Sequence, residues 1–227
     1  MTKQPFLTKI KTVVLKHLFL NSISKSFDLE REKQDMPPKA KFKKEEIIEA
    51  ALSIVREQGF DALTARALGT KLGSSARPIF TVFQSMEEVQ TEVIATAREQ
   101  YNSHIREALS QSKDIHRFKC VGEQYIKFAI SEPKLFQLLF MKEQEHMPNF
   151  TSILPIIEMN YEQILSSIEE EYGFDRSVSQ RIYQHLWVYT HGIATLCATK
   201  MCCFTKEEIS NMMTEIFKSI FKEIKGR

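Results

Sequence analysis

Glycine and proline are scarce in this chain, with seven of each among 227 residues. An all-β protein uses many of both, because it turns every few residues. Hydrophobic residues make up 43% of the chain and charged residues 26%, which is ordinary for a globular protein. We therefore predict an all-α fold with few breaks and enough apolar material for a sizeable core.

Cysteine is also rare, and its spacing argues against a zinc site. The four cysteines form no C-x-x-C pair, and the adjacent Cys202 and Cys203 cannot easily bind one ion together. A metal or redox site remains the alternative, but we favour buried or loop thiols. Cysteine usage and the absence of an evident secretory signal indicate a reducing, cytoplasmic location.

Catalytic motifs are missing as well. The sequence has no G-x-S-x-G, P-loop, G-x-G-x-x-G or H-E-x-x-H motif. We therefore expect no catalytic residues, no cofactor and no metal.

Apolar runs are short, and the one near the N-terminus, residues 13–20, is interrupted by Lys16 and His17. It is too short to span a bilayer, so we expect no membrane partner. Residues 1–36 are consistent with a weak basic amphipathic helix or with a dispensable extension ahead of a start at Met36. We favour the extension, because the apolar face is narrow.

Charge is distributed unevenly along the chain. Residues 1–44 contain 11 Lys and Arg against 4 Asp and Glu, so the net charge of +2 leaves −5 for the remainder. A basic segment of this kind suits a polyanionic partner, although a solvated basic tail has the same composition.

Residues 63–83 have the pattern of a helix-turn-helix. Thr64 is a good N-cap for a short helix, and Gly73 suits a left-handed turn because it has no Cβ. Ser75 then offers an N-cap oxygen to a second helix, which we expect to end at Phe83. That second helix would be free to enter a major groove.

Two further helices frame this motif. We predict the first over residues 43–58, ended by Gly59. The other opens on a capping box formed by Ser85 and Glu88, and should continue to about Ala108.

Residues 43–101 resemble the DNA-binding domain of the TetR family of bacterial transcriptional regulators. The matching features are, in order, an Ile/Ala-rich first helix, a Gly-Phe turn, Leu-Thr-x-Arg, Leu-Gly-x-x-Leu-Gly-x-Ser and Ile-Phe-x-x-Phe-x-Ser-x-Glu-Glu-Val. The chain departs from the family at Phe80 and Met86, where the family usually has the phosphate-contacting residues Tyr and Lys. The resemblance implies a dimeric regulator, most often a repressor, bound to a near-palindromic double-stranded DNA operator and released by a small-molecule effector.

The resemblance and the exposed positions together give a set of expected DNA contacts. Arg77 can bind guanine O6 and N7 through both guanidinium nitrogens, for about 1–3 kcal/mol of discrimination. The full expected set, base-reading and phosphate-contacting, is Lys43, Thr64, Arg66, Lys71, Ser75, Ala76, Arg77, Phe80 and Thr81. The alternative is an all-α ligand-binding or interaction module that keeps the fold without reading DNA.

The rest of the chain is predicted to form an effector-binding and dimerisation domain over residues 97–227, after a helix-turn-helix domain over residues 37–96. We expect its helices at residues 114–129, 133–140, 156–172, 175–200 and 205–225, with a loop at 142–150.

The last helix has an apolar arc too wide for the surface of a monomer, which indicates a homodimer. The residues expected at that interface are Ile209, Met213, Ile216, Phe217 and Ile220.

The segments Trp187-x-x-x-His191-Gly192 and Phe128-Ala129-x-x-x-Pro133 resemble a C-terminal ligand-binding domain found in part of the TetR family. The expected ligand-pocket residues are Phe128, Phe136, Phe140, Met159, Trp187 and His191. For His191, a packed core histidine with a satisfied hydrogen bond is the alternative, and we favour it.

Overall fold

The computed structural model describes residues 40–111, 116–143 and 147–225, and the predicted extension at residues 1–36 lies outside them. By their contacts, residues 42–227 form one compact unit. The described residues contain helices and no strand, which confirms the predicted all-α fold. The helical elements are α2 (Lys44–Gln58), η1 (Phe60–Ala62), α3 (Ala65–Lys71), η2 (Arg77–Thr81), α4 (Met86–Leu109), α5 (Arg117–Ser131), α6 (Pro133–Phe140), α7 (Ile153–Ile157), α8 (Tyr161–Tyr172), α9 (Arg176–Ala198) and α10 (Lys206–Lys225).

The elements from α2 to the start of α4 enclose a small apolar core. Its members come from α2, α3, η2, α4 and the segment between η2 and α4, and they are at most 2% exposed: Ile47, Ile54, Leu68, Ile79, Phe83, Val89 and Val93. Three predicted signals at the helix ends are confirmed. Thr64 accepts a hydrogen bond from the Ala67 amide, and Gly59 and Gly73 have φ angles of 93° and 61°.

The second helix of the turn motif differs from the prediction. We expected an α-helix from Ser75 to Phe83, capped by Ser75, and the structure has a 3₁₀-helix over Arg77–Thr81 with Ala76 at its N-cap and no side-chain cap. Pro78 has no N–H to donate, and the Ile79 amide bonds to the Ala76 carbonyl at 3.1 Å, three residues back. The Val82 amide likewise bonds to the Ile79 carbonyl at 3.0 Å, and bonds to the third residue back are those of a 3₁₀-helix.

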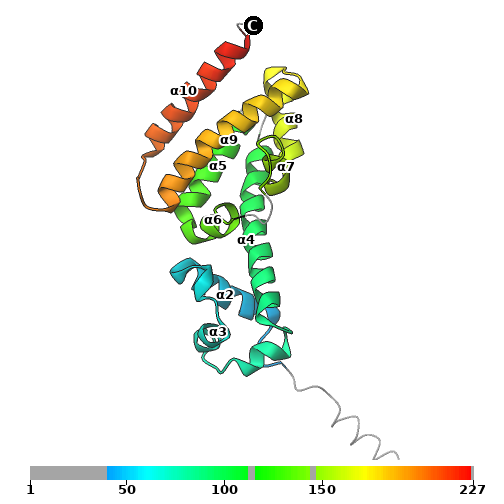
Figure 1. Cartoon of the computed structure of the whole chain (residues 1–227), viewed down its shortest axis with the longest axis vertical. Helices are drawn as coiled ribbons and strands as arrows, with labels where there is room; N and C mark the ends of the chain where they lie inside the picture. The colour runs from blue at the N-terminus through cyan, green and yellow to red at the C-terminus, as the bar shows by residue number, and fades with distance from the viewer. Residues whose placement is uncertain (1–39, 112–115, 144–146, 226–227) are drawn as a thin grey trace, which may run out of the picture. The chain divides into compact units, whose positions relative to one another are not determined.

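Helix α4 belongs to both functional parts of the chain. Figure 1 shows it passing from α2 and α3 to the helices of the second half, where it packs on α5. The boundary predicted at residues 96–97 therefore falls inside one continuous helix. Helix α5 packs on α4 and α9, and α10 packs on α9 and α5.

The helix predicted over residues 156–172 is broken into α7 and α8. At the break, Glu158 and Asn160 are each 5% exposed. The Glu158 carboxyl accepts a hydrogen bond of 2.6 Å from the Tyr101 hydroxyl and one of 2.9 Å from the Asn160 amide. The Glu158 carboxyl turns toward α4 instead of solvent. Its hydrogen bonds satisfy a backbone amide at the break that a continuous helix would have paired with a backbone carbonyl.

An ion pair fastens α2 to the second half of the chain. Arg56 Nε lies 3.0 and 3.1 Å from the two carboxylate oxygens of Glu132, at the junction of α5 and α6. Arg56 Nη2 also donates to the Gln100 side chain on α4 at 3.0 Å. Because both partners of the ion pair are less than a third exposed, the link fixes how α2 docks on α6.

Other predicted boundaries are confirmed within a few residues. Asp175 caps α9 by accepting from the Val178 amide at 2.9 Å, and Gly173 ends α8 with a φ of 68°. Thr205 and Glu208 form the predicted capping box of α10, with bonds in both directions. Asp114, predicted to cap the helix now assigned as α5, lies outside the described residues.

Candidate functional site

The turn motif presents a surface built from η2 and the loop before it. Ser75, Arg77 and Thr81 are exposed, and Phe80 is 43% exposed, whereas Ala76 is half-buried. The Thr81 hydroxyl donates to the Pro78 carbonyl at 2.7 Å, so its oxygen is left to accept and its methyl group is available for apolar contact. Ile79 is the buried residue of η2, so the opposite face of this helix is turned away from the core.

Gly69 sets the distance between α3 and the loop that leads into η2. A Cβ atom at this position would lie 2.9 Å from backbone atoms of both Ser75 and Ala76. Because backbone cannot move aside as a flexible side chain can, only glycine allows this approach.

The expected phosphate contacts differ in their availability. Lys71 already donates to the Glu57 carboxylate at 2.7 Å, and this bond helps to hold the pKa of Glu57 below its usual value. Lys43, Arg66 and Arg77 are exposed and make no ion pair within the described part of the chain. These three side chains are therefore the available cations of the predicted set, and all are suited to bind phosphates or bases.

Residues 47–93 match the family model described as bacterial regulatory proteins, tetR family, a segment that begins in α2 and ends within α4. This segment is a TetR-family DNA-binding domain. No curated protein matches the chain significantly. The match makes the chain a DNA-binding transcriptional regulator and assigns the exposed surface of η2 to its DNA-binding domain.

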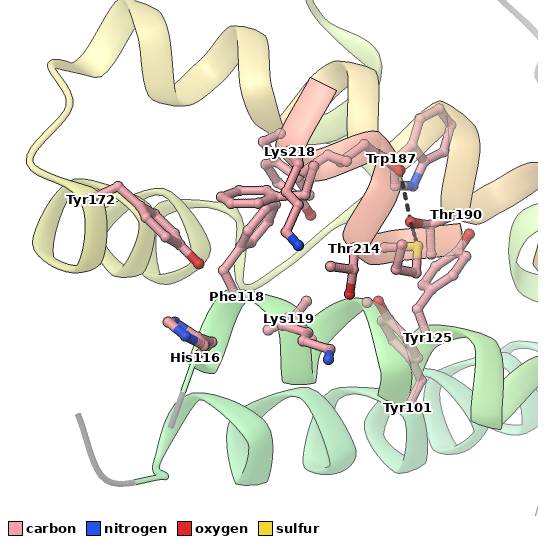
Figure 2. Close-up of a pocket in the computed structure, with 16 residues that line it drawn as sticks. Tyr101, His116, Phe118, Lys119, Tyr125, Tyr172, Trp187, Thr190, Thr214 and Lys218 are labelled. Carbon is pink, nitrogen blue, oxygen red and sulfur yellow. Dashed lines mark hydrogen bonds between the residues drawn. The ribbon is translucent and has the colours of Figure 1, made fainter. Parts of the chain in front are cut away.

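The second half of the chain contains a cavity of about 300 Å³ between α5, α9 and α10. Tyr101 of α4 and Tyr172 of α8 also reach it. Figure 2 shows Tyr172 and His116 toward one end, Trp187, Thr190 and Tyr125 toward the other, and Lys119, Lys218 and Thr214 between them. The remaining lining residues are Phe118, Val121, Gly122, Tyr183, Leu186, Met213 and Phe217.

Of the six residues predicted for a ligand pocket, Trp187 lines this cavity and the other five lie elsewhere. Phe128, Phe136 and Phe140 belong to an aromatic core cluster with Tyr101 and Tyr125, with ring centroids 4.9–5.9 Å apart. Helical periodicity finds the side chains that face inward, but it does not find which of them leave space between them.

Two further predicted pocket residues have polar partners. Met159 is 70% exposed, and its sulfur lies 3.0 Å from the Asn102 amide nitrogen. His191 Nδ1 lies 2.9 Å from the Tyr125 hydroxyl, and the ring stacks on Trp187 at 5.0 Å. Burial lowers the pKa of His191, so the ring is a neutral core histidine with a satisfied hydrogen bond.

The predicted dimer residues on α10 face two different surroundings. Ile209 and Met213 are each 8% exposed and pack within their own subunit, and Phe217 lines the cavity against Tyr172. Ile216 and Ile220 are half-buried and retain apolar surface.

On α9, a stripe of His185, Val188 and Gly192 is exposed. Val188 is 50% exposed, and a Cβ at Gly192 would meet no atom within 4 Å. Sequence reasoning did not single out His185 or Val188, because a stripe with one apolar side chain gives no amphipathic signal.

The four cysteines are all free, and Cys120 and Cys197 are half-buried. Within the described ranges, no cluster of three or more His, Cys, Asp or Glu side chains could hold a metal ion. None of the described helices combines the length and the apolar character needed to cross a membrane.

Proposed function

We propose that the chain is a ligand-responsive repressor that binds a near-palindromic operator as a homodimer. The observation that carries the proposal is the continuity of α4. Val89 and Val93 on this helix complete the core beneath η2, and Tyr101 on the same helix lines the cavity. A ligand that displaces Tyr101 acts directly on the helix that packs beneath the DNA-binding surface.

Such a ligand changes operator affinity only through its different affinity for two conformations of the dimer. In the DNA-bound conformation, two η2 elements must lie about 34–36 Å apart, so that they reach successive major grooves on one face of the duplex. The ligand-bound conformation has a different separation, set by the tilt of α4.

The test of DNA reading uses fluorescence anisotropy with duplexes tiled across the promoter of the chain's own gene. A reader with several phosphate contacts loses affinity steeply as salt rises. Arg77→Ala should weaken binding to the preferred duplex by about 1–3 kcal/mol and relax the preference for a guanine contact. Lys127→Ala, at an exposed position on α5, is the control and should change neither. Equal behaviour of the two variants would remove Arg77 from base reading.

The dimer interface that we propose combines the exposed stripe of α9 with Ile216 and Ile220 of α10. Val188→Glu should produce monomers by sedimentation velocity and abolish tight operator binding, because it puts a charge into an apolar contact. Ile130→Glu is a matched control, since Ile130 on α5 is also 50% exposed. A Val188→Glu protein that remains dimeric would move the interface to another surface.

A further inference from the structure

The cavity between α5, α9 and α10 has a chemical character that specifies its ligand more closely. We propose that it binds an amphipathic monoanion, a small hydrocarbon body that carries one carboxylate or similar acidic group. The inference rests on the proposed function in taking this cavity as the effector site, and it adds the class of effector.

The body of the ligand is set by the walls. Phe118, Val121, Leu186, Trp187 and Met213 supply mainly apolar surface. Ligand sites of proteins range from about 300 to 1,000 Å³, so a cavity of about 300 Å³ is at the small end. The walls therefore favour a single chain or one ring system over a large drug-like molecule.

The charge of the ligand is set by Lys218. This side chain is exposed and makes no hydrogen bond or ion pair with any described residue, and Figure 2 shows it extending from α10 toward the space between Phe118 and Thr214. None of the sixteen lining residues is Asp or Glu. A ligand anion would give the Lys218 ammonium the partner that the described protein does not supply.

The other charged groups nearby have partners of their own. Lys119 donates to Ser210 Oγ at 3.1 Å and lies 3.7 Å from the Glu123 carboxylate. Glu170 pairs with the Arg117 guanidinium at 2.9 Å.

The Oε1 atom of Glu171 accepts from the backbone amide of Arg117 at 2.7 Å, and its Oε2 atom is buried without a partner among the described residues. His116 lies beside the Tyr172 ring, 6.2 Å between centroids. Of the two lysines that line the cavity, Lys218 is therefore the one without a hydrogen-bond or ion-pair partner among the described residues.

Tyr183 gives an independent sign of a polar ligand atom. Its side chain is 95% buried, because the residue is 5% exposed, and it lines the cavity. Its hydroxyl makes no hydrogen bond with any described residue, so its O–H is free to donate to a ligand atom in the cavity. Burial raises the pKa of Tyr183, so the group is an O–H donor, which again suits an acceptor on the ligand.

The chain contains its own reporter for the test. Trp187 is the only tryptophan in the sequence, and it lines the cavity. We would titrate the full chain, without DNA, with decanoate, decan-1-ol and decyltrimethylammonium, and follow Trp187 fluorescence. These probes share one hydrocarbon chain and differ in the charge of the head group.

Decanoate should bind at least fivefold more tightly than decanol, and the cationic probe should be the weakest. Lys218→Gln should weaken decanoate about fivefold and leave decanol unchanged. Lys222→Gln is the matched control, because Lys222 is exposed one turn later on α10 and does not line the cavity.

A second variant, Gly122→Val, tests the location. Gly122 lines the cavity, and a Cβ there would lie 3.1 Å from Met213 Cε, so a larger side chain occupies cavity space. This variant should lose the fluorescence response to decanoate. Circular dichroism would verify that each variant is folded.

The inference is overturned if decanol binds as tightly as decanoate, or if Lys218→Gln and Lys222→Gln behave alike. Operator binding is measured separately. Operator affinity that is unchanged at saturating decanoate would refute the effector role and leave the ligand class standing. A protein that binds its operator but none of the three probes would refute the ligand class and leave DNA binding standing.

Discussion

Removing the hydroxyl of Tyr101 should destabilise the fold far more than removing the hydroxyl of Tyr183. The two side chains are similarly buried, at 2% and 5% exposed, and both line the same cavity. They differ in one respect. The Tyr101 hydroxyl donates to Glu158 Oε2 at 2.6 Å, whereas the Tyr183 hydroxyl has no partner among the described residues.

The magnitude follows from what the substitution leaves behind. Tyr101→Phe keeps the ring contacts with Tyr125, Phe128 and Phe140, all at centroid distances of 4.9–5.9 Å. It removes the donor to one oxygen of a buried carboxyl, and hydrogen bonds to charged groups contribute about 1.5–3 kcal/mol. We expect the free energy of unfolding to fall by about 2 kcal/mol for Tyr101→Phe, and by less than about 0.5 kcal/mol for Tyr183→Phe.

Urea denaturation followed by circular dichroism measures both. With a slope of about 2 kcal/mol per molar urea, the midpoint of Tyr101→Phe should fall by about 1 M. The Glu158→Gln variant and the double variant complete a cycle that isolates the pairwise energy. Equal midpoints for Tyr101→Phe and Tyr183→Phe would show that the bond to Glu158 contributes nothing to stability.

Two other substitutions test the turn motif and the core histidine. Gly69→Ala should destabilise the chain by about 1–3 kcal/mol and weaken operator binding, because its Cβ would meet backbone of Ser75. Gly122→Ala is the control in urea denaturation, since its Cβ meets a flexible methionine end, and a Gly69→Ala protein as stable as this control would contradict the close approach. Burial lowers the pKa of His191 in the folded state. The neutral ring therefore contributes to the free energy of unfolding above pH ~6.5, and this contribution is lost as the pH falls below that value. Between pH 7.5 and 5.5, wild type should lose more stability than His191→Gln, because burial disfavours the protonated ring. If the melting temperatures of wild type and His191→Gln change with pH in parallel, His191 does not cause the loss of stability at low pH.

Much of the fold could be predicted from the sequence, because local signals set it. Gly73 and the Asp175 cap act within a few residues of themselves, and the sequence shows both. The break at Glu158 could not be predicted in this way. It depends on a bond to Tyr101, 57 positions away, and helical periodicity contains no information about such a partner.

The candidate sites were predictable to different degrees. Arg77 is exposed as its position in the motif predicted. The cavity was less accessible to sequence reasoning, because Met213 and Phe217 have the periodicity of an interface helix and line a space within one subunit instead. Whether an apolar side chain faces a partner or a void depends on tertiary packing.

The ion pair between Arg56 and Glu132 affects how chimeric regulators should be assembled from this chain. Anyone who grafts the DNA-reading part onto a foreign sensor would naturally cut within α4, where the two halves meet. A graft joined there leaves the Arg56 guanidinium facing a foreign surface, without the carboxylate that it contacts here at 3.0 Å. The recipient must therefore supply an acidic side chain where its fifth and sixth helices meet, or the two modules will lose the contact that sets their mutual orientation.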